Sequence, residues 1–198
     1  MSSLLFLQAV NFHAQNASAD RRDCELLGDL ASGSADAFAE LYDRHAASLH
    51  RHAVALTRDV ADAEDLVHAV FVKLATTGAE LLGVRAPASY LHRMLHTTWI
   101  DGGRRRTTGD QVVARAGREQ AAWAGIRTSG PEDAVDVSRA LQILPAAERE
   151  AIVLHLTEGF SFREIGRMTG VSLFTAAGRY RQGIGRLRKS FGANTEKK

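Results

Sequence analysis

The side chains best suited to chemistry lie in a short acidic stretch and in a nearby group of histidines. The acidic stretch contains Asp62, Glu64, Asp65 and His68. The histidine group consists of His45, His50 and His52. Such side chains can bind metals or transfer protons. However, the chain has one cysteine and no phosphate loop or nucleophile motif. We therefore expect no catalytic residue, cofactor or metal, and histidines at the surface or core edge.

Basic residues near the end of the chain suggest another chemistry, the binding of a polyanion. Residues 158–181 predict a helix-turn-helix: Ser161 and Glu164 match a capping box, Gly170 can end the first helix and Ser172 can cap the second. The second helix places an apolar face at Leu173, Ala176, Tyr180, Ile184 and Leu187. This is how a recognition helix is presented to a major groove. A plain helical hairpin with a solvated basic face is the alternative.

Charge is unevenly distributed along the 198 residues, although the formal net charge is only +2. Residues 20–87 hold 12 acidic and 7 basic side chains. Residues 88–118 hold 6 basic and 2 acidic side chains, and residues 159–198 hold 9 basic and 2 acidic ones. One acidic region and two basic regions suggest a protein partner on one surface and a polyanion on others.

Two amphipathic helices are predicted in the acidic region. Residues 36–56 place their apolar side chains on one stripe. Asp59 can cap a second helix, in which residues 63–74 form an unbroken apolar stripe with the acidic side chains facing away. Residues 76–85 contain two glycines and predict a loop.

A third helix is expected to begin at Pro87, which suits a first helical turn. Its apolar face includes Tyr90 and Trp99, and we expect it to end at Asp101-Gly102-Gly103, directly before three arginines. Arginines suit phosphates, and aromatic rings suit unstacked bases. A core tryptophan followed by solubilising arginines would have the same sequence.

The remaining segments complete an all-α protein of two small helical domains joined by a linker. Residues 1–19 form an N-terminal extension whose apolar run is too short for a signal peptide or membrane span. Residues 20–106 form the first domain. Residues 107–130 carry four glycines and predict the linker. Helices within residues 135–144 and 147–157 join the helix-turn-helix in a second domain, residues 131–192, before a tail over residues 193–198.

The order of these parts resembles an ECF-type (extracytoplasmic function) sigma factor of bacterial RNA polymerase over roughly residues 23–191. The family's polymerase-clamp-binding helix is similar to Asp62-Ala63-Glu64-Asp65-Leu66-Val67 and Val70-Phe71-Val72-Lys73-Leu74. The helix that melts and reads the minus-ten element is similar to Tyr90-Leu91-His92-Arg93-Met94, Ile100-Asp101 and Arg104-Arg105-Arg106. The entry to the second domain is similar to residues 140–145 with Arg149-Glu150, and the helix-turn-helix that reads the minus-thirty-five element to residues 159–181.

The resemblance implies three sets of contact residues. Polymerase binding is expected at Asp62, Glu64, Asp65, Leu66 and His68. Minus-ten DNA binding is expected at Tyr90, Arg93, Thr97, Arg104, Arg105 and Arg106. Minus-thirty-five DNA binding is expected at Phe174, Thr175, Arg179, Arg181 and Gln182. Its implied partners are core RNA polymerase and promoter DNA, with an anti-sigma factor as a further candidate, and no membrane or small-molecule substrate. The implied location is the cytoplasm.

The sequence departs from the family pattern at several of these places. The family usually carries a basic residue and a serine where this chain has Ala177 and Gly178. Ala69 stands where an acidic residue is common, Thr97 where asparagine is common, and Gly102-Gly103 where bulky apolar residues are common. These differences bear on the promoter sequence and on promoter affinity rather than on the fold.

Two other functions are compatible with parts of the sequence. A stand-alone helix-turn-helix regulator could use the first domain for dimerisation or protein binding, but it would not need the acidic helix at residues 62–73. An enzyme would need a motif that the sequence lacks. Co-elution with core polymerase separates the regulator from a sigma factor, and an activity screen tests the enzyme.

Overall fold

The computed structural model describes residues 20–108 and 140–195, in which all regular elements are helical. The N-terminal part comprises a helix over residues 20–31, α2 (Ala35–Thr57), α3 (Val60–Thr77), the 3₁₀ helix η1 (Gly78–Gly83) and α4 (Pro87–Thr108). The C-terminal part comprises a helical segment that ends at residue 142, α6 (Ala146–Ile152), the π-helical turn η2 (Val153–Thr157), α7 (Phe162–Thr169) and α8 (Leu173–Thr195). The all-α prediction is confirmed.

Local signals set the ends of the first long helices. The Ser34 hydroxyl caps α2 by accepting a hydrogen bond from the N–H of Ala37 at 3.2 Å. Arg58 ends α2 in the left-handed conformation, with φ of 62°. Asp59 then caps α3, as predicted, with its carboxylate 3.0 Å from the N–H of Asp62. This short connection folds α3 back along α2.

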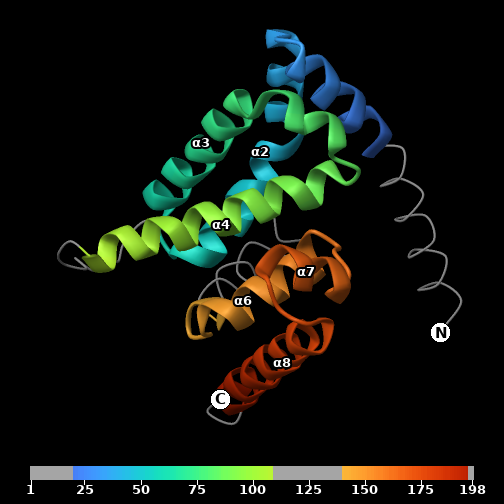
Figure 1. The fold of residues 1–198 in the computed structure, drawn as a ribbon. Helices are drawn as coiled ribbons and strands as arrows, with labels where there is room; N and C mark the ends of the chain where they lie inside the picture. The colour runs from blue at the N-terminus through green and yellow to red at the C-terminus, as the bar shows by residue number, and fades with distance from the viewer. Residues whose placement is uncertain (1–19, 109–139, 196–198) are drawn as a thin grey trace, which may run out of the picture.

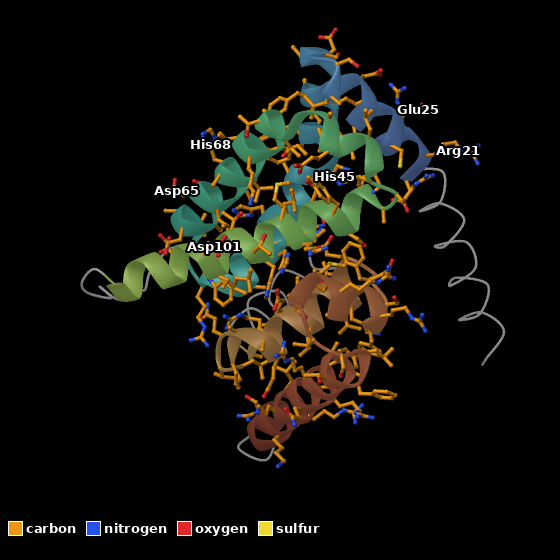
Figure 2. All side chains as sticks on the ribbon, in the orientation of Figure 1. Arg21, Glu25, His45, Asp65, His68 and Asp101 are labelled. Atoms are coloured by element: carbon orange, nitrogen blue, oxygen red, sulfur yellow. The ribbon has the colours of Figure 1, made fainter. Side chains whose placement is uncertain are left out.

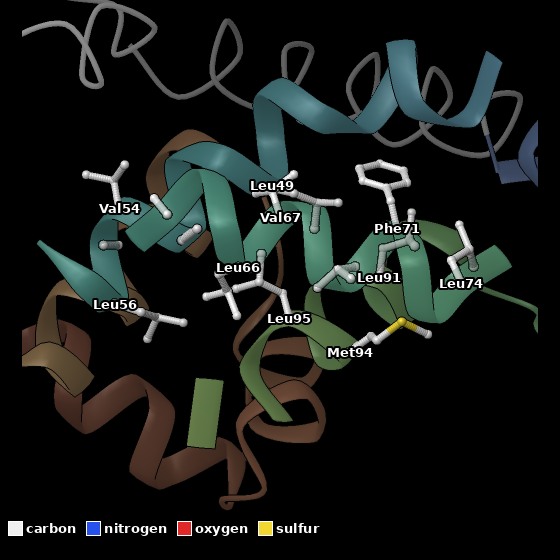
Figure 3. Close-up of a cluster of buried hydrophobic side chains, with 14 of the residues drawn as sticks. Leu49, Val54, Leu56, Leu66, Val67, Phe71, Leu74, Leu91, Met94 and Leu95 are labelled. Carbon is white, nitrogen blue, oxygen red and sulfur yellow. The ribbon is translucent and has the colours of Figure 1, made fainter. Parts of the chain in front are cut away.

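The apolar stripes of α2, α3 and α4 meet in a common core (Figure 3). The side chains at its centre include Leu49, Val67, Phe71, Leu91 and Leu95. The stretch Val60–Gly83 is long and apolar enough to cross a membrane by composition alone. Here the apolar stripe of α3, from Ala63 to Leu74, packs against α2 and α4 in the protein core.

Two predicted element boundaries were wrong. Residues 76–85 were expected to be a loop, but α3 continues to Thr77 and most of the remainder forms η1, with Leu81 buried. The third helix was expected to end at Asp101-Gly102-Gly103, but α4 continues to Thr108. At the second boundary, each glycine in the helix costs only about 1 kcal/mol relative to alanine. The preceding turns of α4 are already packed against the core, and this packing offsets that cost.

The C-terminal helices pack directly against the N-terminal ones (Figure 1). α4 lies against α7, while α2 lies against α6 and η2. The apolar core crosses this boundary, because Leu141, Leu144, Ile152 and Val153 belong to the same buried cluster as the core of α2, α3 and α4. α8 lies on the far side of α6 and α7, away from α3. The linker proposed for residues 107–130 lies almost wholly outside the described residues.

The helix-turn-helix prediction is confirmed in its caps and its turn, but Leu173, which was expected on the apolar face of the second helix, is 39% exposed. The Ser161 hydroxyl accepts a hydrogen bond from the Glu164 N–H, and the Glu164 carboxylate accepts one from the Ser161 N–H at 2.8 Å, which completes the capping box. Gly170 ends α7 with φ of 71°. The Ser172 hydroxyl accepts from the N–H of Thr175 at 3.0 Å and so caps α8. Ile165, Met168 and Ala176 form the buried centre between the two helices.

Candidate nucleic-acid and protein interfaces

The outer face of α3 presents acidic and polar side chains to solvent. Its exposed residues are Asp62, Glu64, Asp65 and His68. Figure 2 shows Asp65 and His68 on the side of α3 that faces away from the C-terminal helices. Leu66 instead lies in the core, where its side chain is 8% exposed, so it supports the acidic face from beneath.

A groove of about 670 Å³ runs between α2 and α3 beside this acidic face. Tyr42, which is 45% exposed, and Val67 contribute apolar surface to it. Glu64 and His68 contribute polar groups from α3. An aromatic and apolar centre beside a charged rim is the usual composition of a protein–protein interface. The groove and the acidic face therefore form one surface suited to a protein partner.

The outer face of α4 combines basic, polar and aromatic side chains. Arg93 and Thr97 are exposed and Tyr90 is half-buried, whereas Leu91 and Leu95 are held in the core. The last turns of α4 contain Arg104, Arg105 and Arg106. The helix therefore brings all six predicted residues onto one element, with its apolar side fixed in the core. Cations along such a helix suit a phosphate backbone, and the aromatic ring suits an unstacked base.

The start of α8 carries the candidate readers of duplex DNA. Phe174 is 80% exposed, and Arg181 and Gln182 are exposed, while Arg179 is half-buried. The hydroxyl groups of Thr175 and Ser172 lie 2.8 Å apart, so the Thr175 hydroxyl is engaged in the helix cap. Arginine and glutamine can each form paired hydrogen bonds with a base in the major groove.

Gly166, whose role the sequence analysis missed, allows α7 to pack closely against the turn that precedes α8. A Cβ atom at Gly166 would lie 2.7 Å from the carbonyl oxygen of Val171 in the turn. No side chain can be accommodated there without a shift of the backbone. A glycine in the middle of a predicted helix, as at Gly166, was the available signal.

A buried polar interface between the two parts of the chain was also missed. The ring nitrogens His52 Nε2 and His96 Nδ1 lie 2.8 Å and 2.6 Å from the same oxygen, Oε1 of Glu150. Burial alone would raise the pKa of Glu150, but the hydrogen bonds from the two histidines lower it to about 2. The expectation of surface or core-edge histidines was thus wrong for His52, whose side chain is fully buried.

A second carboxylate extends this interface. Glu158 accepts hydrogen bonds from Arg51 Nε at 2.7 Å and Nη2 at 2.9 Å, and from the Ser48 hydroxyl at 2.5 Å. Ser48 Oγ lies 3.0 Å from Nε2 of His92. Burial, reinforced by the charges of neighbouring histidines and Arg51, holds the pKa of His92 well below its ordinary value of 6.5.

Guanidinium contacts from Arg149 and Arg58 close the interface on its other side. Arg149 is 1% exposed and donates hydrogen bonds to the carbonyl oxygens of Ala55 and Leu144. Arg58 donates to the same Leu144 carbonyl at 2.8 Å. The C-terminal helices thus supply Arg149, Glu150 and Glu158 to partners on α2 and α4, an arrangement that no local sequence signal could reveal.

Among the described residues, His52, His96 and Glu150 are also of the types that bind zinc. Their contacts are those of hydrogen bonds, at 2.8 Å and 2.6 Å. Ligands around a tetrahedral zinc ion, with bonds of about 2.0–2.1 Å, would lie about 3.3 Å apart. We therefore assign the three side chains to hydrogen bonding.

Comparison with known proteins matches both parts of the chain. Residues 41–108 match the family model for Sigma-70 region 2, and residues 134–187 match the model for Sigma-70, region 4. The ECF RNA polymerase sigma factor SigM of Mycobacterium tuberculosis is 30% identical, over 94% of this chain and 92% of its own length. The RNA polymerase sigma factor CarQ of Myxococcus xanthus is 32% identical, over 81% and 92%.

Solved structures share the fold. CnrH, in complex with the cytosolic domain of CnrY, has a TM-score of 0.60 at 23% identity and covers 86% of this chain and 97% of its own. The sigma factor RpoE of Bartonella quintana, in complex with the anti-sigma factor NepR, has a TM-score of 0.62 at 23% identity and covers 77% and 94%. The chain therefore belongs to the ECF sigma factors, the dissociable subunits that bind core RNA polymerase and direct it to promoter DNA.

Proposed function

We propose that this sigma factor binds polymerase and promoter DNA through the outer faces of three helices. The face of α3 binds core polymerase, the outer face of α4 engages the minus-ten element, and α8 enters the major groove at the minus-thirty-five element. The single observation that supports this division is that each face is exposed while the opposite side of the same helix is packed in a core. The protein acts in the cytoplasm, as a transcription initiation factor and not as an enzyme.

The acidic face of α3 serves polymerase binding together with the groove beside it. Asp62 and Asp65 supply charge that can steer a basic partner, and the exposed ring of Tyr42 supplies apolar contact. Glu64 and His68 lie on the rim of the groove. Leu66 acts indirectly, by fixing α3 to the core.

The two DNA-contacting faces divide the promoter between them. Arg93, Thr97 and Tyr90 lie where a melted strand could follow α4, and Arg104 to Arg106 continue the same helix. On α8, Arg181 and Gln182 are the groups that can distinguish bases, while Phe174 and the methyl group of Thr175 can pack on thymine methyl groups.

The packed arrangement is a closed state that must open for promoter binding. The two promoter elements are about 25 base pairs apart, which is about 85 Å of B-form DNA at about 3.4 Å per base pair. A compact chain of this length has a radius of gyration of only about 16 Å. Residues 20–106 and 131–192 therefore separate as two domains, which the glycine-bearing linker over residues 107–130 permits.

An anti-sigma factor would bind this sigma factor in a packed arrangement. The solved relatives CnrH and RpoE of Bartonella quintana each share the fold while in complex with another protein, the cytosolic domain of CnrY and NepR respectively. Those likenesses support a partner of the same class here, and co-purification with the source cell's membrane and soluble fractions would identify it.

A binding assay with core RNA polymerase tests the central assignment. The double variant Asp62→Lys with Asp65→Lys should lose at least tenfold in affinity for core while its helical content stays unchanged. The matched control, Asp29→Lys with Asp36→Lys, makes the same change in net charge at exposed positions near the start of α2. Equal affinity in both double variants would remove polymerase binding from the α3 face. Failure of the parent protein to co-elute with core would favour a stand-alone regulator instead.

A further inference from the structure

Four hydrogen bonds link two carboxylates of the C-terminal helices through three side chains of α2 and α4. From one end to the other, Glu158 contacts Ser48 at 2.5 Å and Ser48 contacts His92 at 3.0 Å. The Nδ1 atoms of His92 and His52 then lie 3.0 Å apart, and His52 Nε2 lies 2.8 Å from Glu150. The side chains of His52, His92, Glu150 and Glu158 are all buried or nearly so.

This row of five hydrogen-bonded side chains needs one more proton than its neutral and ionised members supply. Each hydrogen bond uses one hydrogen. Serine supplies one O–H, each neutral imidazole supplies one N–H, and an ionised carboxylate supplies none. The neutral chain therefore offers three hydrogens for its four contacts. Without a further proton, two acceptors would face each other in a buried site, which is costly.

The surrounding charges decide which group holds that proton. Glu158 faces the Arg51 guanidinium through two hydrogen bonds, which favours its ionised form. The pKa of Glu150 is lowered to about 2, and the pKa of His92 is held well below 6.5. His52 remains. With both ring nitrogens protonated, it donates from Nε2 to Glu150 and from Nδ1 to His92, whose own Nε2–H donates to Ser48.

We propose that a single proton, held on His52 between His92 and Glu150, locks the two domains together, so that pH controls the opening of this sigma factor. His52 and His92 belong to the N-terminal helices, and both carboxylates that orient them belong to the C-terminal part. Separation of the domains breaks the hydrogen bonds to Glu158 and to Glu150, at the two ends of this row of side chains. The separation of the domains and its consequence for transcription rest on the proposed function, but the protonation of His52 in the packed state does not.

A proton held in this way makes the equilibrium between packed and separated domains depend on pH in both directions. The pair stays on α2 and α4 when the domains separate, but it loses both carboxylates and becomes open to water, in which an imidazole ordinarily has a pKa of about 6.5. Above that pH the open form has neither proton and the closed form has one, so closure takes up a proton and rising pH favours opening. Below it the open form has two protons and the closed pair still has one, so closure releases a proton and falling pH also favours opening. Each limb changes the opening equilibrium by up to about tenfold per pH unit.

Several other charged groups surround the pair, and neither Glu150 nor His45 among them reproduces this pattern. They are His45 and Arg51 on α2, His96 on α4, Arg149 and Glu150 on α6, and Asp23, Glu164 and Arg167 at the cleft beside His92. Glu150 has its pKa lowered from 4.5 to about 2, so its stabilisation of the closed form is present above pH 4.5 and is lost only as the pH falls towards 2. His45 is paired with Asp23 inside the N-terminal part, at 2.8 Å, and keeps that partner when the domains separate.

Small-angle X-ray scattering of the full chain between pH 5 and 9 tests the proposal without DNA or polymerase. The radius of gyration of the parent protein should pass through a minimum near pH 6.5. His52→Gln should lose the rise above that pH and keep the rise below it, whereas His92→Gln should do the reverse. His50→Gln, a control on the same helix outside the chain of hydrogen bonds described above, should keep both limbs. Circular dichroism shows whether each variant is folded.

Nitrogen-15 NMR of the histidine rings provides an independent readout on the parent protein. At pH 7 one ring should carry protons on both nitrogens, and its signal should be the one missing from His52→Gln. A flat or monotonic radius of gyration in the parent, or rings that are all neutral at pH 7, would overturn the proposal. Compaction that requires added Zn²⁺ and is lost with a chelator would overturn it in favour of a metal bridge. None of these outcomes bears on polymerase binding, which the pull-down tests separately.

Discussion

The proposed recognition of duplex DNA rests on single residues of α8. The family's usual basic residue and serine are replaced by Ala177 and Gly178, neither of which reaches a base edge. Arg181 and Gln182 are exposed and long enough to do so. On the proposed assignment, base recognition rests on few side chains, and the substitution of each should have a large and separable effect.

Arg181→Ala should relax the preference at one or two base pairs of the minus-thirty-five element. A paired hydrogen bond between arginine and guanine is worth about 1–3 kcal/mol of discrimination, and alanine removes it. Selection of minus-thirty-five sequences from a random library by the holoenzyme measures this directly. A selected consensus identical to that of the parent would place the reading face on another side of α8.

Ala177→Lys should raise promoter affinity without altering the selected sequence. The new ammonium group can reach a phosphate, and phosphate contacts supply affinity rather than sequence choice. The same selection supplies the consensus, and a titration of labelled promoter supplies the affinity. Ala177→Gln is a control of similar length without the charge. A changed consensus in the lysine variant would show that position 177 faces the bases.

At the scale of elements, local signals were predictable and long-range ones were not. Ser161, Glu164 and Gly170 set the ends of α7 through contacts within three or four residues, so the helix-turn-helix could be derived from sequence. His52 and Glu150 are 98 residues apart in the chain, and nothing near either residue indicates the other.

The same distinction explains the helix end that was predicted wrongly. Gly102-Gly103 lowers helix propensity locally, and propensity was the available signal there. In the structure α4 continues through both glycines to Thr108, so the helix context outweighed this local preference. The three predicted contact faces follow from amphipathic patterns that survive folding. Their division between polymerase and DNA came from the family resemblance, because exposure alone does not identify a partner.

Two glycine substitutions in the helix-turn-helix compare a position that has no room for a side chain with a position that has room for one. Gly166→Ala should lower the free energy of unfolding by roughly 1–3 kcal/mol, because its Cβ atom would lie 2.7 Å from the Val171 carbonyl oxygen. Gly178→Ala should raise it by up to about 1 kcal/mol, because no atom lies within 4 Å of the added Cβ and alanine is the better helix former. Thermal denaturation followed by circular dichroism compares the two. Equal effects of the same sign would contradict the described turn.

The end of α4 should bind promoter DNA through charge. Replacement of Arg104, Arg105 and Arg106 by alanine should weaken holoenzyme–promoter binding about equally for different promoters. The slope of log affinity against log salt should become shallower by roughly one unit for each phosphate that an arginine no longer neutralises. Affinity measured between low and moderate salt gives the slope. If the slope stays that of the parent, these arginines do not bind phosphates in the complex.

At the scale of the whole molecule, the described structure is a state in which the DNA-contacting elements are held together by a buried polar interface. Glu150, Glu158 and Arg149 on one side meet α2 and α4 on the other. If the domains separate on promoter binding, as proposed, polymerase and promoter must supply enough binding energy to break these contacts. On the proposed function, conditions that weaken this interface make the separation of the two domains easier.

Transcription by core RNA polymerase from the source organism shows whether this protein directs the polymerase to promoters. The full-length protein is added to core on a library of genomic DNA fragments, and the 5′ ends of the transcripts are mapped. We expect discrete start sites that core alone does not produce, each preceded by two sequence elements at one common spacing, and we expect these sites to be lost with the variant Asp62→Lys and Asp65→Lys. Transcripts with the same starts and yield in the presence and absence of the protein would contradict this expectation.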